Sequence, residues 1–342
     1  MPVLSELLSA RPEEPLWTLL RQCGVEHVVA LLRNGEQEQR MFAHVGGARL
    51  TGSGDAVPWS EAALAQDVRL FADHGFTVVA VEDTAPLDEA RLGLAGRDEQ
   101  IEHVQEQIRA MGRLGIPVLC YNWMAVSSWA RTDFAVESRG GALVTGFREE
   151  ESNALPPLAE PGEITEEQLW DSLEYFLHAV VPVAEEAGVR LGLHPDDPPL
   201  PVTRGVPRIM RSLDAFRRVL DLHPSPYNGV TLCQGNFALM TDDLPAWIRE
   251  LAARDVLQFV HFRDVRGDAH SFVETFHDDG QNDLAACMRA YEEVGFDGPL
   301  RPDHVPTMAG ETNERPGYET LGRLFANGYI RGLADAAAGG RA

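Results

Sequence analysis

The stretch Leu300-Arg301-Pro302-Asp303-His304 is a short β-type run that ends in a carboxylate beside an imidazole. Three other segments share this design, since each is a hydrophobic run ending in one side chain that can bind a metal. They are Leu191-Gly192-Leu193-His194-Pro195, Gly229-Val230-Thr231-Leu232-Cys233-Gln234-Gly235 and Gln258-Phe259-Val260-His261-Phe262-Arg263-Asp264. Four such ends predict one divalent-metal site at the mouth of a parallel barrel, with His194, Cys233, His261 and Asp303 as ligands. Two imidazoles, a thiolate and a carboxylate suit a soft-to-borderline cation.

Composition excludes several classes of partner. The chain has 342 residues, is 44% hydrophobic and carries a net charge of −24, from 53 acidic and 29 basic residues. This charge argues against nucleic acid and against an anionic membrane as partners. It leaves room for a small anionic substrate, because an arginine and a metal can reverse the field inside one pocket.

The expected location is the cytoplasm. No run approaches the roughly 20 apolar residues of a membrane span, and the first residues lack the basic region of a signal peptide. Four cysteines in a chain of 342 residues do not resemble a disulfide framework, so a reducing compartment is expected.

Strand-like and helix-like runs alternate along the chain, which is typical of βα units. We therefore predict an α/β fold, a TIM (β/α)8 barrel formed by residues 1–333 as a single domain with an N-terminal helical extension. Residues 334–342 are predicted to be a disordered tail. The eight predicted strands are Val25–Leu32, Phe76–Glu82, Ile116–Asn122, Val189–Pro195, Gly229–Gln234, Val256–Asp264, Ser271–His277 and Pro299–His304.

Two places depart from the regular barrel. The segment Ala125–Gly162, after the third predicted strand, is long and rich in Pro, Gly, Glu and Arg, which is typical of lids and substrate-binding loops. The gap between Asp264 and Ser271 is too short for a helix, so the sixth and seventh predicted strands lack the usual crossover.

His304 and Tyr318 are the candidates for proton transfer. If Asp303 faces the metal, His304 projects beside it as an acid or base, or else orients a ligand. Tyr318 follows the loop 305–317, so its phenol could return over the mouth; the alternative is an ordinary first-turn helix residue.

Four residues are candidates for binding the substrate. Arg131 could clamp a carboxylate through two hydrogen bonds, although a surface arginine in a polar loop is equally common. Arg263 follows a proposed ligand and either faces the pocket or pairs with a nearby acid. Asn122 ends a predicted strand, and His277 contacts substrate hydroxyls or belongs to a solvated turn.

The ordered segments resemble the mannonate dehydratase family, which lies within the xylose-isomerase-like barrels. The similar stretches span roughly residues 75–332 and are Cys120-Tyr121-Asn122-Trp123-Met124, Trp129-Ala130-Arg131-Thr132-Asp133, Leu193-His194-Pro195-Asp196-Asp197-Pro198-Pro199, Pro207-Arg208-Ile209, Thr231-Leu232-Cys233-Gln234-Gly235, His261-Phe262-Arg263, Arg301-Pro302-Asp303-His304, Arg315-Pro316-Gly317-Tyr318 and Gly322-Arg323-Leu324. The resemblance implies that the four predicted ligands bind Mn²⁺ or Fe²⁺ and that His304 and Tyr318 transfer protons. It also implies loss of water from a sugar acid, D-mannonate or a close relative, giving a 2-keto-3-deoxy acid.

Two other functions stay open at this point. One is a metal-dependent sugar isomerase or epimerase on the same barrel, acting on a neutral ketose. The other is a metal-binding relative without activity, against which the retained His304 and Tyr318 argue. Barrels of this kind often associate, so a homo-oligomer is also possible.

Overall fold

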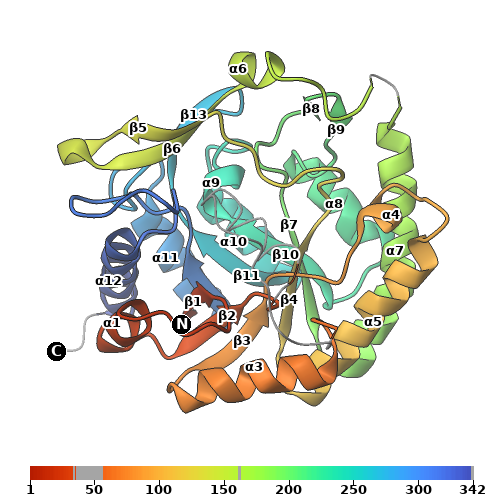
Figure 1. The fold of residues 1–342 in the computed structure, drawn as a ribbon, viewed down its shortest axis with the longest axis horizontal. Helices are drawn as coiled ribbons and strands as arrows, with labels where there is room; N and C mark the ends of the chain where they lie inside the picture. Colours follow the sequence, from red (N-terminus) through yellow and green to blue (C-terminus); the bar gives the residue numbers. More distant parts are fainter. Residues whose placement is uncertain (34, 36–56, 161–162, 340–342) are drawn as a thin grey trace.

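A closed barrel of eight parallel strands forms the centre of the molecule (Figure 1). The computed structural model describes residues 1–33, 35, 57–160 and 163–339. Around the barrel the strands follow the order β1-β14-β11-β10-β7-β4-β3-β2. Their bounds are β1 Val3–Leu8, β2 His27–Ala30, β3 Thr77–Val81, β4 Val118–Asn122, β7 Arg190–His194, β10 Asn228–Cys233, β11 Leu257–Phe262 and β14 Pro299–Pro302. The predicted TIM barrel is confirmed.

One of the eight predicted strands was wrong. Ser271–His277 is not a barrel strand, and its place is taken by β1, where a helical extension was expected. Two polar residues interrupt the apolar pattern of β1 and conceal the strand in the sequence. Both are buried and satisfied: Ser5 donates to the Leu300 carbonyl at 3.1 Å, and Glu6 accepts from Asn327 at 2.8 Å.

Helices surround the barrel, as the βα alternation predicts. The longer helices are α1 Leu16–Gln22, α3 Glu61–Asp73, α5 Arg97–Arg113, α7 Glu166–Ala187, α8 Leu213–Leu222, α10 Leu244–Ala253, α11 Leu284–Glu293 and α12 Thr320–Ala337. The short ones are α4 Asp88–Arg91, η1 Arg139–Gly141, α6 Glu149–Asn153 and α9 Gln234–Phe237. Helix α12 continues four residues into the segment predicted to be a disordered tail, and residues 340–342 lie outside the described part of the chain.

A second sheet stands beside the mouth of the barrel, at the upper left of Figure 1, and is called the insertion sheet here. Its antiparallel strands have the order β12-β13-β6-β5. Their bounds are β5 Asp133–Glu137, β6 Leu143–Arg148, β12 Val265–Asp268 and β13 Ser271–Glu274, and the two-residue strands β8 Val202–Thr203 and β9 Val206–Pro207 pair separately. The long segment Ala125–Gly162 therefore follows the fourth barrel strand and contains half of this sheet, while residues 161–162 lie outside the description. The short gap after Asp264 is the turn of the β12–β13 hairpin.

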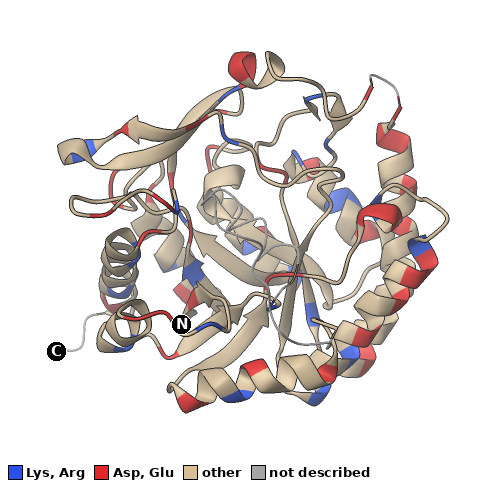
Figure 2. Cartoon of the chain, in the orientation of Figure 1, with Lys and Arg blue, Asp and Glu red and all other residues tan. Residues whose placement is uncertain are grey.

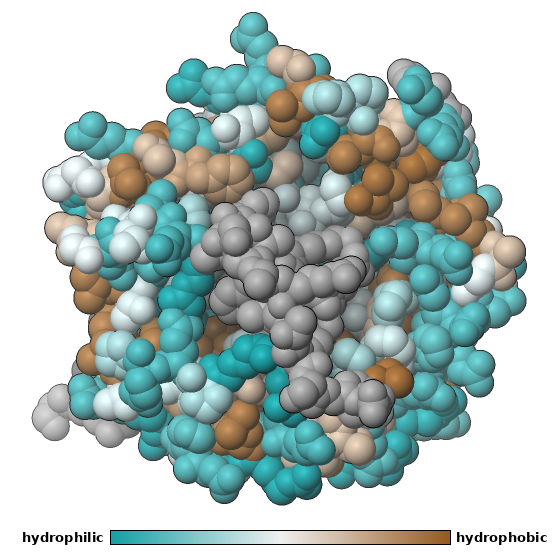
Figure 3. All heavy atoms as spheres, in the orientation of Figure 1, coloured by the Kyte–Doolittle hydropathy of each residue, from teal (hydrophilic) through white to brown (hydrophobic). Residues whose placement is uncertain are grey.

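Apolar side chains from several strands close the barrel interior. Leu7, Val29, Ala80, Val118 and Phe259 come from five different strands and form one buried cluster. Acidic residues are numerous on the outer helices (Figure 2). The described residues on the face shown in Figure 3 are mostly hydrophilic, with a hydrophobic group at the upper right. Within the described residues, no helix combines the length and apolar character needed to cross a bilayer.

Candidate active site

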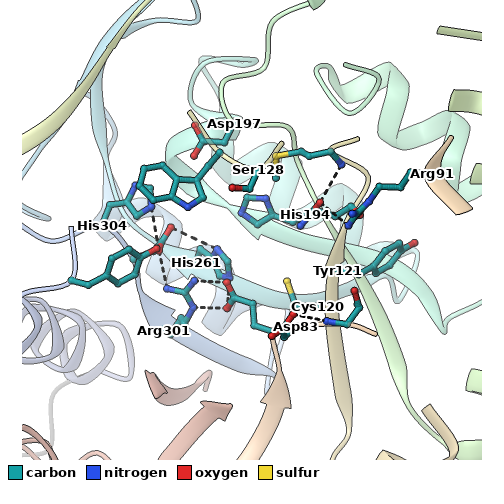
Figure 4. Close-up of a pocket in the computed structure, with 17 residues that line it drawn as sticks. Asp83, Arg91, Cys120, Tyr121, Ser128, His194, Asp197, His261, Arg301 and His304 are labelled. Carbon is teal, nitrogen blue, oxygen red and sulfur yellow. Dashed lines mark hydrogen bonds and ion pairs between the residues drawn. The ribbon is translucent and has the colours of Figure 1, made fainter. Parts of the chain in front are cut away.

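A cavity opens at the carboxyl ends of the barrel strands (Figure 4). Polar and aromatic side chains dominate its wall. The described residues that line it are Glu82, Asp83, Thr84, Arg91, Cys120, Tyr121, Asn122, Met124, Ser128, Trp129, His194, Asp197, His261, Arg301, Asp303, His304 and Tyr318. This is the end of a TIM barrel at which catalytic groups are found.

Strand register brings the predicted metal ligands together. His194 ends β7, and Cys233 at the end of β10 lies opposite His261 in β11. One ligand atom from each of these three side chains lies within 4.8 Å of the others. Asp303 follows β14 directly, and its Oδ2 lies 3.7 Å from His261 Nδ1. Separate strands thus bring two imidazoles and one sulfur close to one another, and the Asp303 carboxylate lies beside the His261 imidazole.

The hydrogen bonds of the two histidines fit a bound cation. His194 Nδ1 donates to the Pro195 carbonyl at 2.7 Å, which leaves Nε2 for a metal. His261 Nε2 lies 3.1 Å from Glu82 Oε2, and its buried Nδ1 has no hydrogen-bond partner within the described chain. A metal-binding imidazole commonly donates its second N–H to a carboxylate or carbonyl in this way. The donor set of nitrogen, sulfur and oxygen could hold Mn²⁺, Fe²⁺ or Zn²⁺.

Positive neighbours keep Asp303 ionised. Arg301 donates to Asp303 Oδ1 at 2.9 Å, and Arg263 Nε lies 3.2 Å from Oδ2. Burial opposes ionisation, but His304, Arg301, His261 and Arg263 together hold the pKa of Asp303 well below its usual range. The carboxylate is therefore negative at neutral pH, as a metal ligand must be.

Glu82 and Arg301 support this centre, and neither is among the residues predicted for the site. Glu82 follows β3, and its carboxylate receives two hydrogen bonds from Arg301, at 2.7 and 2.8 Å. Burial raises its pKa, yet Arg301 and His261 prevail and lower it to about 2. Arg301 contacts Glu82 and Asp303 at once, so one guanidinium links the carboxylate that orients His261 to the carboxylate beside the proposed metal.

His304 and Tyr318 both line the cavity, as Asp303 does. Their rings meet edge-on at 5.5 Å, and the Tyr318 hydroxyl donates to Asp303 Oδ1 at 3.3 Å. Burial and the Asp303 charge raise the pKa of Tyr318 well above its usual value, so the phenol keeps its proton at neutral pH. Tyr318 precedes α12, which begins at Thr320, so it is not a first-turn helix residue.

Arg131 and Arg263 lie behind the cavity wall and are not among the described residues that line it. Both are buried, and both contact Asp197 and Glu274, forming what is called here the arginine–carboxylate cluster. Arg131 donates to the two oxygens of Asp197 at 2.6 and 3.0 Å. Arg263 also donates to Cys233 Sγ at 3.1 Å. Arg131 was predicted to clamp a substrate carboxylate, but in the structure it pairs with carboxylates of the protein itself.

The other two predicted substrate contacts differ in position. Asn122 lines the cavity, and its Oδ1 accepts from Arg91 at 3.1 Å. His277 is buried away from the described lining, and its Nε2 donates to the Phe262 carbonyl at 2.7 Å. Arg91 and Glu274 were missed because neither ends a recognisable barrel strand. Glu82 was recognisable only as a polar residue at a strand end.

Comparison with known proteins agrees with this geometry. The model of the D-mannonate dehydratase (UxuA) family matches residues 19–159 and 157–341. The chain belongs to the D-mannonate dehydratase family. Mannonate dehydratase 2 of Halalkalibacterium halodurans is 35% identical over 291 residues, which cover 77% of this chain and 83% of the relative.

Solved structures extend the comparison from the family to the fold. Mannonate dehydratase from Streptococcus suis serotype 2 matches with a TM-score of 0.87 and 29% identity, covering 100% of this chain and 95% of that one. A xylose isomerase domain protein from Planctomyces limnophilus matches with a TM-score of 0.59 and 12% identity, over 99% of this chain and 98% of that one. The second likeness shows the xylose-isomerase-like fold alone.

The burial of His277 predicts acid sensitivity. Burial lowers its pKa to about 4, and its Nδ1 has no hydrogen-bond partner in the described structure. Protonation would therefore place a charged, unpaired N–H in the protein interior. The unfolded chain binds this proton more readily than the folded chain. The contribution of neutral His277 to the free energy of unfolding is therefore complete above about pH 6.5 and is lost as the pH falls toward 4. His277→Gln, whose amide can still donate to Phe262, should remove up to about 3 kcal/mol of the stability difference between pH 7 and pH 4. Urea denaturation across this range measures it.

The exposed His270 provides the control. His270→Gln should leave the acid-dependent loss of unfolding free energy in place. Equal pH slopes for wild type and His277→Gln would contradict a neutral, buried His277.

Proposed function

We propose that this protein is a metal-dependent hydro-lyase that removes water from D-mannonate to give a 2-keto-3-deoxy acid. The proposal is carried by the convergence of His304 and Tyr318 on the cavity that His194, His261 and Asp303 line, in a chain of the D-mannonate dehydratase family. Cys233 offers a ligand atom within 4.8 Å of those of the two ligand histidines. The isomerase or epimerase alternative is supported only by likeness of fold. The chemistry below follows from the positions of the side chains.

His194, Cys233, His261 and Asp303 would hold the divalent cation, for which we propose Mn²⁺ or Fe²⁺. A bound cation supplies Lewis-acid stabilisation of negative charge on the carboxylate or a neighbouring oxygen of the substrate. Glu82 and the Pro195 carbonyl fix the two imidazoles from behind, and Arg301 and Arg263 keep Asp303 negative. Two of the four proposed ligands thus carry the oriented partners typical of metal sites.

Dehydration requires two proton movements. The C2 proton must be taken up by a base, the C3–oxygen bond must break, and the departing hydroxyl must receive a proton. We assign the base to the His304 imidazole and the acid to the Tyr318 phenol, whose oxygen carries its proton at neutral pH. Water leaves, and the resulting C2–C3 enol becomes the 2-keto-3-deoxy acid. The 5.5 Å separation of the two rings lets both reach adjacent carbons of one substrate.

Asn122 and Arg91 form the polar wall proposed to contact the rest of the sugar acid. Arg91 donates to the Asn122 backbone carbonyl at 3.0 Å as well as to its side chain, which holds both groups at the cavity edge. Arg131, Arg263 and His277 lie behind the wall and are not proposed as substrate contacts.

The function is tested by following 2-keto acid formation from D-mannonate with Mn²⁺ present. His304→Asn should keep its metal and lose turnover by roughly 10²–10⁴-fold, the usual contribution of a general acid or base. His103→Asn, in α5 and outside the described cavity lining, is the matched control and should keep wild-type turnover. Conversion of neutral sugars alone, or no turnover on a panel of sugar acids, would refute the dehydratase proposal.

The proposed sulfur ligand has a separate test. Cys233→Ala should greatly reduce bound metal, because it removes one of four donors from a buried centre. Cys287→Ala is the control, since Cys287 is also buried but lies in α11 and belongs to no candidate ligand group among the described residues. Metal content is measured by elemental analysis after dialysis, and equal content in all three proteins would rule out Cys233 as a ligand.

A further inference from the structure

Glu274 belongs to the insertion sheet yet reaches the active site. It ends β13, and its side chain is only 2% exposed. Its Oε1 lies 2.9 Å from His304 Nδ1 and 2.5 Å from an Arg131 nitrogen, and it also accepts from Arg263. Its Oε2 is buried without a hydrogen-bond partner in the described residues. All of the carboxylate's close contacts are thus made by one oxygen, which faces His304 and the two arginines.

Counting hydrogens decides the direction of the His304 contact. The terminal nitrogen NH2 of Arg131 has two hydrogens and two charged acceptors, Glu274 Oε1 and Asp197 Oδ2 at 3.0 Å. This nitrogen also lies 3.1 Å from His304 Nδ1, but both of its hydrogens already have acceptors. His304 Nδ1 therefore carries the hydrogen and donates it to Glu274. The lone pair of the neutral imidazole then resides on Nε2.

The surroundings of His304 restrict its ring to this orientation. Trp129 lies 5.1 Å from the imidazole on one side, and Tyr318 meets it edge-on. The backbone of His304 has φ of +38°, a strained conformation for a residue with a side chain, and the amide of Val305 bonds to Gly317 at 2.8 Å. A strained backbone held by its neighbours is common where a side chain must be aimed.

We propose that Glu274 is a positioning residue, which holds His304 as the Nδ1–H tautomer so that Nε2 faces the substrate as the base. This inference rests on the proposed dehydratase function for its kinetic consequence, but not for the tautomer itself. It gives the insertion sheet a role in catalysis, because the orienting carboxylate comes from β13 and not from a barrel strand.

The mechanism explains why a carboxylate is needed at this position. Without Glu274, the released hydrogen of Arg131 can be donated to His304 Nδ1, which moves the imidazole hydrogen to Nε2. An imidazole in that tautomer presents N–H to the substrate and cannot accept its proton. When His304 does take up a proton, the adjacent carboxylate stabilises the imidazolium, as in other carboxylate–histidine pairs.

The direct test reads the tautomer from ¹⁵N spectra of the full chain labelled at histidine and loaded with diamagnetic Zn²⁺ at fixed pH. His304→Gln assigns the signal. We expect Nδ1–H in wild type and Nε2–H in Glu274→Met, which keeps the length of the side chain but has no oxygen to accept the His304 hydrogen. Glu149→Met is the matched control, because it removes the carboxylate of the exposed Glu149–His270 pair and leaves every contact of His304 in place. It should keep Nδ1–H at His304.

Kinetics with D-mannonate and Mn²⁺ provide the second readout. In Glu274→Met, kcat should fall by roughly 10²–10⁴-fold while KM stays within about threefold and bound metal is unchanged. Absence of turnover in wild type would refute the proposed function, and the tautomer would still be decided by its spectrum.

Three results would overturn the inference. They are an Nε2–H tautomer in wild type, an unchanged tautomer in Glu274→Met, or a changed tautomer with wild-type kcat. If Glu274→Met fails to fold, the wild-type spectrum alone decides the inference, because it requires no variant of Glu274.

Discussion

The burial of Arg263 among four negative or sulfur-bearing partners holds the active site together. Its guanidinium contacts Cys233, Asp303, Asp197 and Glu274. These four residues come from β10, the position after β14, the loop after β7 and the insertion sheet. Removing one member of such a buried pair typically costs about 3–5 kcal/mol, since it leaves an uncompensated charge. Arg263 therefore fixes the positions of its four partners relative to one another. It contacts two proposed metal ligands, Cys233 and Asp303, and also Glu274, the carboxylate proposed to orient His304.

Two sheets meet at this support. The barrel supplies the proposed ligands from strand ends, where parallel register places His261 opposite Cys233 and Asn122 opposite His194. The insertion sheet supplies Glu274, and Arg131 lies just before β5 of the same sheet. Chemistry at the barrel mouth thus depends on a structure outside the barrel, which differs from a simple division into catalytic barrel and covering lid.

The sequence could predict the fold because apolar runs ending in polar residues recur once for each βα unit. It failed at β1, whose buried Ser5 and Glu6 are satisfied by partners almost 300 residues or more away. It placed the proposed ligands together for the same reason that it found the barrel, since a strand end is a local signal with a fixed place in the fold.

The partners of each buried arginine could not be predicted from the sequence. Arg131 resembles a substrate clamp, and only the structure reveals Asp197 and Glu274 around it. Glu274 itself lies in a run that imitates a barrel strand, so its contact with His304 across 30 residues leaves no local pattern. Long-range pairing of charges depends on tertiary structure, and no spacing rule records it.

The most direct measurement of the central claim is X-ray absorption spectroscopy of the protein loaded with Zn²⁺. If ligands from separate strands share one cation, the spectrum will contain one sulfur scatterer at about 2.3 Å together with nitrogen and oxygen scatterers. The sulfur signal will disappear when Cys233 is replaced by serine. A spectrum with nitrogen and oxygen neighbours alone in the wild-type protein would contradict the account.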